Sequence, residues 1–451
     1  MRSAEFRRNL WLELSPQRVI ALPLIVLVVV LMQQATGGGN AQLAQVGSWL
    51  YFGMVLLWGS RRAAAAVTEE VNSGTWAGQR LSALSPAALA LGKLFGATAF
   101  IWYGGAIGLG LFVGGALGDG VPPLWAAAEA VQRIAWGVFV HAVAVAASLV
   151  LLNKRRLVER VGTTLPHMLA LAAAVGLYML FWRSPLFIDV FVDHYGWQLR
   201  WYELKLPTWV FLPAVSAIFA GWAVLACLRL MAVQLQRQPL PWAWPAFSLF
   251  LLAFAHGFVP GDVGKDFGLI APQLIAVALF YLALFADRNE PLRFRHGFAA
   301  LRDGALRRGL SLMPWWAFSW LILLAVALWP SAMDAVRGLW EALARHSGAT
   351  IADPLVARLG VAAFALRDAA FVLFVNAGGR SQRSDLVAFI YLLVLYGPVL
   401  GLLLGMEAWP VAAMFAPLPF GPAGLGLASA LVQAAVLALL TRQRWRALFL
   451  S

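Results

Sequence analysis

Long apolar runs fill most of the chain, and short polar or charged segments separate them. Each run measures about 17–25 residues, which is enough for one helical crossing of a bilayer. The runs at 20–32 and 386–404 lack the alternation of polar and apolar positions that β-barrel strands carry. Because backbone groups in lipid must be satisfied internally, this pattern predicts membrane-spanning helices.

The runs predict an all-α, polytopic transmembrane bundle of about twelve spans. The expected limits are 18–35, 43–60, 94–117, 124–152, 161–182, 208–231, 243–260, 267–286, 313–330, 356–377, 386–406 and 423–441. Residues 409–422 are apolar but rich in proline, which favours a re-entrant or interfacial segment over a further span.

Composition agrees with a membrane protein. Of the 451 residues, 61% are hydrophobic and 12% are charged, about half the charged fraction of a soluble protein. Lys and Arg number 34 against 21 Asp and Glu. In a soluble protein this excess would indicate nucleic acid. Here most of the basic residues fall on the side of the N-terminus, so the positive-inside rule predicts cytoplasmic N- and C-termini and no nucleic-acid partner.

The polar segments divide the chain into four parts. Residues 1–17 place apolar side chains at helical spacing and predict an amphipathic helix in the interface before the first span. Residues 18–286 form an N-terminal membrane region of about eight spans, with a cytoplasmic segment at 61–93. A second cytoplasmic amphipathic segment follows at 287–312, and residues 313–451 hold about four more spans.

The cytoplasmic segment after the second span carries the most specific pattern. Glu69 and Glu70 open a short polar stretch, and Gly74 permits a sharp reversal of the chain. Thr75 can cap the helix that follows. Pro86, preceded by a serine, is a good helix start. The sequence therefore predicts a helix–turn–helix wedge attached to two spans.

This segment resembles the signature of ABC-2 type transporter permeases, the membrane subunits of ABC transporters. The matching residues are Glu70, Gly74-Thr75, Pro86 and Gly92-Lys93, whereas Val71 and Trp76 depart from the pattern and Pro86 falls a few residues later than the pattern has it. The resemblance covers about the first third of the chain. It implies a multi-pass protein of the bacterial cytoplasmic (inner) membrane that works by alternating access, as an exporter.

The resemblance also implies partners. A separate cytoplasmic ATP-binding subunit would dock on the segment that contains Glu69, Glu70, Gly74, Thr75, Pro86, Gly92 and Lys93. A homodimer or a paired permease would enclose the path, among membrane lipids. The chain has no nucleotide-binding loop of its own, because neither of its two Gly-Lys pairs is followed by Ser or Thr. We therefore expect no cofactor on this chain and no enzymatic activity, with ATP bound by the partner.

Polar residues inside the predicted spans are candidates for a substrate path. They are Glu129, Arg133 and His141 in the fourth span and Arg367, Asp368 and Asn376 in the tenth. The alternative is that these residues form locally neutralised packing pairs, which are common between membrane helices. No His, Asp and Glu residues share metal-ligand spacing, and the single cysteine excludes a cysteine-rich site, so no metal is expected.

Two other function classes stay open. A secondary transporter would need no ATPase. A lipid-dependent transferase would place catalytic acids on the outer face, where the loop at 183–207 holds Asp189, Asp193 and His194. The first outer loop, which usually carries such acids, has none. The other long outer loop, 331–355, has no assigned role.

Overall fold

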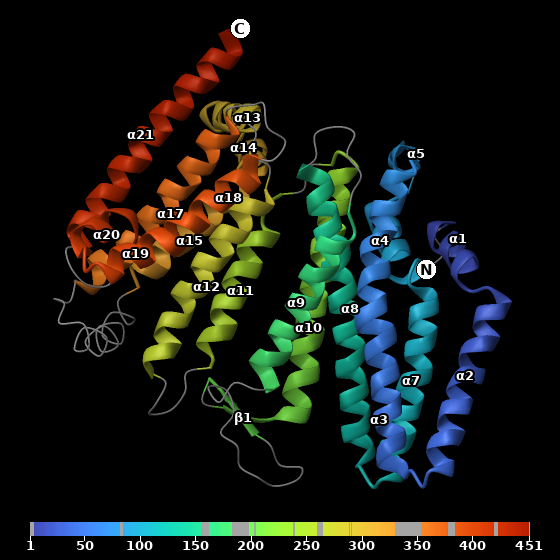
Figure 1. The fold of residues 1–451 in the computed structure, drawn as a ribbon. Helices are drawn as coiled ribbons and strands as arrows, with labels where there is room; N and C mark the ends of the chain where they lie inside the picture. The colour runs from blue at the N-terminus through green and yellow to red at the C-terminus, as the bar shows by residue number, and fades with distance from the viewer. Residues whose placement is uncertain are drawn as a thin grey trace. The chain divides into compact units, whose positions relative to one another are not determined.

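The computed structural model describes residues 4–81, 84–154, 162–182, 198–202, 204–237, 240–258, 265–287, 289, 291–329, 353–377, 384–418 and 423–450. These residues are almost entirely helical (Figure 1), as expected for an all-α protein. The exception is a two-stranded sheet of β1 (Gln198–Trp201) and β2 (Leu204–Pro207). The chain divides into two compact units. Unit 1 is Met1–Arg200 with Leu204–Pro239, and unit 2 is Trp201–Glu203 with Leu240–Ser451.

Unit 1 begins with a short helix that a serine separates from the first long one. Ser15 accepts a hydrogen bond from the Arg18 backbone and Pro16 occupies the first turn, so the second helix starts there. The elements are α1 (Ala4–Glu13), α2 (Pro16–Ala35), α3 (Asn40–Tyr51), η1 (Phe52–Trp58), α4 (Gly59–Asn72), α5 (Trp76–Leu81), α6 (Pro86–Leu91), η2 (Gly92–Gly96), α7 (Ala99–Gly118), α8 (Pro123–Lys154), α9 (Thr164–Trp182) and α10 (Thr208–Gln234).

One core cluster of unit 1 lies where α3 and η1 meet α7, which run side by side in Figure 1. Tyr51 and Val55 are buried there against Phe100 and Ile101. Further along, an added Cβ on Gly47 would lie 2.4 Å from a backbone nitrogen of α7, so the two helices require glycine at their contact. Helical geometry continues from α3 through η1 into α4 without a break.

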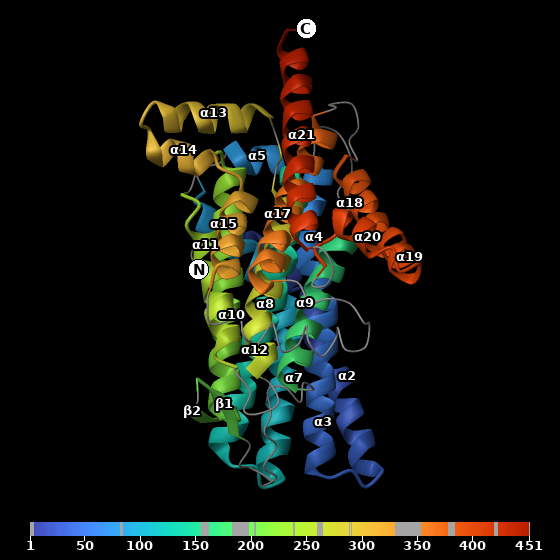
Figure 2. The same cartoon turned by 90° about the vertical axis from the view of Figure 1, so that its left-hand side faces the viewer.

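Unit 2 holds the remaining helices. They are α11 (Ala243–His256), α12 (Lys265–Ala286), α13 (Pro291–Arg302), α14 (Leu306–Leu312), α15 (Trp315–Ala327), α17 (Pro354–Asn376), α18 (Ser384–Val394), η4 (Leu395–Val399), α19 (Leu400–Gly405), α20 (Trp409–Phe415) and α21 (Ala423–Leu450). Phe280, Leu323 and Val372 are central in its core. Helix α14 meets α15 at 93°, and Figure 2 shows α13 and α14 lying across the direction of α15.

Within the described residues, seven helices are long and apolar enough to cross a membrane, or eight if α14 and α15 together form one span. Shorter apolar helices, such as α11, occupy several of the other expected spans. The protein is therefore a helical chain with several candidate spans, and the count of twelve with cytoplasmic termini stays a prediction. Of the Pro-rich stretch 409–422, residues 409–415 form the short helix α20. The expectations for 183–197 and 331–352 lie outside the described residues.

Candidate functional site

A cluster of charged and amide side chains joins the first helix to the segment identified in the sequence. We call it the charged cluster. Its members are Glu5, Arg8, Asn9 and Glu13 of α1, Arg62, Glu69 and Glu70 of α4, Gln79 of α5 and Lys93 of η2. Three of the predicted docking residues thus contact α1 or share a partner with it: Glu70 and Lys93 in one set of contacts, and Glu69 in a second set through Arg62.

Lys93 is the centre of this cluster. Its side chain is only 1% exposed, and its ammonium group lies 2.7 Å from Glu5 Oε1 and forms a second ion pair with Glu70 Oε2. A buried ammonium group is tolerated only when carboxylates neutralise it. The Lys93 side chain therefore ties η2 to both α1 and α4.

Glu70 receives further donors from two other elements. Arg8 Nη2 donates to Glu70 Oε1 at 2.6 Å, and Gln79 Nε2 donates to the same oxygen at 2.7 Å. The carboxylate of Glu70 is thereby shared by α1, α5 and η2. This arrangement gives a physical reason for a glutamate and a lysine at these positions, since each satisfies the other's buried charge.

Gly92 lets α1 approach closely enough to form these contacts. A Cβ added to Gly92 would lie 2.7 Å from Glu5 Cγ, closer than Cβ atoms approach a neighbour in real proteins. Asn9 Nδ2 donates to the Gly92 carbonyl at 3.3 Å and to Glu5 Oε1 at 3.0 Å. The Gly-Lys pair of the signature thus combines a close approach with a buried charge.

A second set of ion pairs joins the other end of α1 to α4. Arg62 donates to Glu13 Oε1 from Nε at 3.0 Å and from Nη2 at 2.6 Å, and to Glu69 Oε2 at 2.6 Å. Burial alone would lower the pKa of Arg62, but the hydrogen bonds and charges of Glu69 and Glu13 outweigh it and raise that pKa. Arg62 is therefore a fixed positive charge between the two carboxylates.

Glu5 shows the same balance with the opposite sign. Burial raises the pKa of the Glu5 carboxyl. The hydrogen bond and charge of Lys93, the charge of Arg8 and the hydrogen bond of Asn9 lower it by more, so the net shift of this pKa is downward. The carboxylate form of Glu5 is therefore the stable one in the folded protein.

The turn between α4 and α5 has the geometry expected from its glycine. Gly74 has φ +77° and nothing lies within 4 Å of a Cβ added there. Thr75 Oγ1 donates to the Glu70 carbonyl at 3.3 Å and lies 3.0 Å from Ser73 Oγ. After the turn, Ser85 caps α6, with Pro86 in its first turn.

Helix α5 is the exposed tip of the segment. Its own residues Trp76 and Gln79 are buried, whereas its Leu81 side chain is 89% exposed and its Arg80 side chain is also exposed. The tip thus presents one apolar and one basic side chain to solvent. The sequence interpretation missed both Leu81 and the role of α1, because neither the exposure of one side chain nor the contact between distant segments has a local signal.

The substrate-path candidates of unit 1 form separate contacts. Arg133 Nη1 donates to Glu129 Oε2 at 2.6 Å, as their four-residue spacing suggests, and its guanidinium lies 3.7 Å from the centre of the Phe112 ring. His141 is buried, with Nε2 2.9 Å from the Val55 carbonyl in η1. The His141 ring thus contacts a backbone carbonyl group of the π-helical segment η1.

The candidates of unit 2 form a denser network. Arg367 donates to Asp368 Oδ1 from Nε at 2.8 Å and from Nη2 at 2.5 Å. Two hydroxyl groups, those of Tyr281 and Tyr396, donate to Asp368 Oδ2 at 2.5 and 2.8 Å. Asn376 Nδ2 instead donates to Asp385 at 2.8 Å. Because the Arg367–Asp368 pair is fully buried and satisfied, its charges are neutralised within unit 2.

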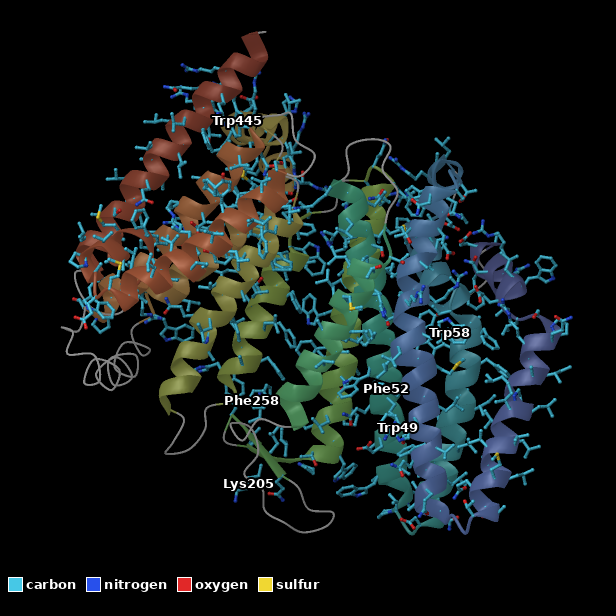
Figure 3. All side chains as sticks on the ribbon, in the orientation of Figure 1. Trp49, Phe52, Trp58, Lys205, Phe258 and Trp445 are labelled. Atoms are coloured by element: carbon cyan, nitrogen blue, oxygen red, sulfur yellow. The ribbon has the colours of Figure 1, made fainter. Side chains whose placement is uncertain are left out.

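A groove of about 450 Å³ opens in unit 1 beside the charged cluster. Its wall is apolar and comes from α2, η1 and α7, including Trp58, which Figure 3 labels. Its charged end consists of Glu13, Arg18 and Arg62. A groove with one charged end and an apolar body has the character of a site for an amphiphile.

Comparisons of the chain with family models, with curated proteins and with solved structures find no match. Among the described residues, no group of three or more His, Cys, Asp or Glu side chains is placed to hold a metal ion. The transferase candidates Asp189, Asp193 and His194 lie outside the described residues.

Proposed function

We propose that this protein is the membrane-spanning subunit of an ABC-2-like transporter, an exporter driven by a separate ATP-binding subunit in the bacterial inner membrane. It spans the membrane about twelve times with cytoplasmic termini and forms a homodimer or a paired permease. The ATPase docks on α5 and the turn at Gly74, and its closure moves α4 and η2 together, so that the attached spans alternate their access.

One observation carries the proposal. The two ionic residues of the signature, Glu70 and Lys93, form a direct ion pair that α1 encloses. If the segment were an isolated loop, movement of the ATPase would change only the local conformation of that loop. Because buried ion pairs are costly to break, movement of a segment held by them also displaces α4 and η2, which continue from it.

The exposed tip supplies the contact for the partner. Leu81 and Arg80 are exposed on α5, whereas Glu70 and Lys93, which brace the segment, are only 14% and 1% exposed. Arginine is enriched at protein interfaces, and burial of the Leu81 side chain would add apolar contact area beside it.

Co-purification tests the docking. The tagged full chain is isolated in mild detergent from the cells in which it occurs naturally, and the co-purifying proteins are tested for an ATPase. We expect the ATPase to co-purify with the wild type. Leu81→Asp should weaken the complex about tenfold or more, because a charge would face an apolar contact. Leu204→Asp, at another exposed leucine, in β2 (59% exposed), is the control and should leave binding unchanged.

Two results would overturn the proposal. If no ATPase is recovered with the wild-type chain, the ATP-binding subunit that the proposal requires does not bind it. Transport that persists after Leu81→Asp and Gly74→Trp together, at the wild-type rate, would show that the tip transmits nothing.

A secondary transporter is the second candidate, and the Arg367–Asp368 network favours it. Buried ionisable residues in membrane helices often mark ion or proton pathways. Under this function, Asp368→Asn would abolish transport in vesicles loaded without ATP, and an imposed proton or sodium gradient would drive uptake in the wild type. Absence of gradient-driven transport in the wild type would exclude it.

A further inference from the structure

The groove beside α2 points to a lipid site in unit 1. We propose that it binds one anionic glycerophospholipid from the leaflet in which α1 lies. The acyl chain runs along Ala21, Leu22 and Ile25, and the headgroup phosphate binds Arg18. Only the geometry of unit 1 enters this inference, so it does not depend on an ATPase partner.

The apolar wall faces a lipid environment. Helix α2 is long and apolar enough to span a membrane, yet only 6% of it is buried within the protein. Its exposed side chains include Ile20 at 61%, Leu24 at 55% and Leu31 at 58%. Because the medium around such a helix is hydrocarbon, the adjoining apolar groove is filled by an acyl chain.

The groove has a suitable depth for a chain that enters from the membrane surface. Its lining extends from Arg18 to Ile25 along α2, a rise of about 10 Å at 1.5 Å per residue. Phe100 and Ile101 of α7 are buried at its base, and Trp58 is half exposed at its side. The volume of about 450 Å³ lies within the range of ligand pockets, roughly 300–1,000 Å³.

Arg18 supplies the headgroup contact. Its side chain is 56% exposed, and its Nη1 lies 3.6 Å from Glu13 Oε2, too far for a hydrogen bond. A guanidinium group that is exposed and makes no hydrogen bond to a carboxylate can donate to phosphate through two N–H groups.

The remaining charges at the mouth select an anion. Glu13 accepts two hydrogen bonds from Arg62, which also donates to Glu69. Arg18 contacts Glu13 only through the 3.6 Å ion pair and is 56% exposed, so its guanidinium group is open to an anion. A zwitterionic or neutral lipid would gain less from this end of the groove.

Photo-crosslinking tests the site in the full chain. The protein is reconstituted in phosphatidylcholine nanodiscs that contain a trace of phosphatidylglycerol with a diazirine in its acyl chain. After illumination, labelled peptides are mapped by mass spectrometry. We expect labels on α2 and α7 near Ile25 and Ile101. Unlabelled phosphatidylglycerol should displace the probe, and diacylglycerol should not.

Two variants separate the acyl and headgroup contacts. Ala21→Trp places an indole in the groove and should remove the labels, whereas Val28→Trp, on the same helix but outside the lining, should keep them. Arg18→Gln should lower labelling by the phosphatidylglycerol probe about tenfold and leave labelling by a diacylglycerol probe unchanged.

The inference is overturned if Ala21→Trp and Val28→Trp label equally, or if diacylglycerol competes as well as phosphatidylglycerol in the wild type. The competition needs no variant, so a failure of Ala21→Trp to fold leaves the test intact.

Discussion

Replacement of Lys93 by methionine tests whether the charged cluster holds α1, α4 and η2 together. Methionine keeps the length and apolar stem of the side chain but removes the charge, so the packing around η2 changes little. Glu5 and Glu70 would then lose their common counter-ion. Their side chains are only 4% and 14% exposed, so water replaces little of the lost interaction.

The magnitude follows from the contacts. A unit charge pair at 2.7 Å has a gross attraction of about 6 kcal/mol at an effective dielectric constant of 20. Desolvation of the Lys93 ammonium group offsets several kcal/mol of it. Breaking a buried pair costs about 3–5 kcal/mol in net terms. Arg8 still contacts Glu5 at 3.2 Å and Glu70 at 2.6 Å in the variant, so we expect the lower end, about 3 kcal/mol.

The assay is unfolding of the detergent-solubilised chain, followed by circular dichroism over a denaturant series. Glu5→Gln and the double variant with Lys93→Met complete a cycle, in which we expect a coupling energy of about 2 kcal/mol. Glu129→Gln is the control, because the Glu129 side chain is 42% exposed and its pair should contribute about 0–1 kcal/mol. A Lys93→Met variant as stable as the wild type, or strict additivity in the cycle, would refute the reasoning.

Three further predictions address other contacts. Gly92→Ala should cost about 1–3 kcal/mol because its Cβ would meet Glu5, whereas Gly110→Ala, with open space on α7, should be neutral or stabilising; thermal midpoints of the two variants decide this. The lowered pKa of Glu5 means that its stabilisation is full above its ordinary value of 4.5 and is lost as pH falls below that value, so Glu5→Gln should flatten the acid limb of the stability–pH curve. Asp368→Asn should lower the stability by about 3 kcal/mol, and Arg367→Met in the same chain should recover part of it, because no uncompensated buried charge remains.

The local geometry of the α4–α5 turn was readable from the sequence. A glycine after a polar helix end predicts a residue with positive φ, and Gly74 has one. A serine before a proline predicts a helix start, and α6 begins there with Ser85 as its cap. Each of these features depends on one or two neighbouring residues, so single-sequence reasoning has access to it.

The partners of those residues were not readable. The sequence predicts that Lys93 docks with another protein, but its ammonium group is enclosed within unit 1 by Glu5 and Glu70. The pairing joins segments 88 residues apart, and a single sequence holds no record of which distant charges meet. The sequence likewise gives no signal for the exposure of Leu81, since exposure depends on what the fold places around a side chain.

Enclosure of Lys93 changes which part of the segment can meet a partner. A residue that is 1% exposed cannot contact another protein unless α1 leaves. The docking contacts under the proposed function must therefore come from the tip at α5, and Glu70 and Lys93 must act by bracing that tip. Substitutions at the tip should then weaken binding of the ATPase at unchanged stability, whereas substitutions at Lys93 should lower the stability first. Because α1 is part of the brace and is followed directly by α2, displacement of the tip also pulls on the first span.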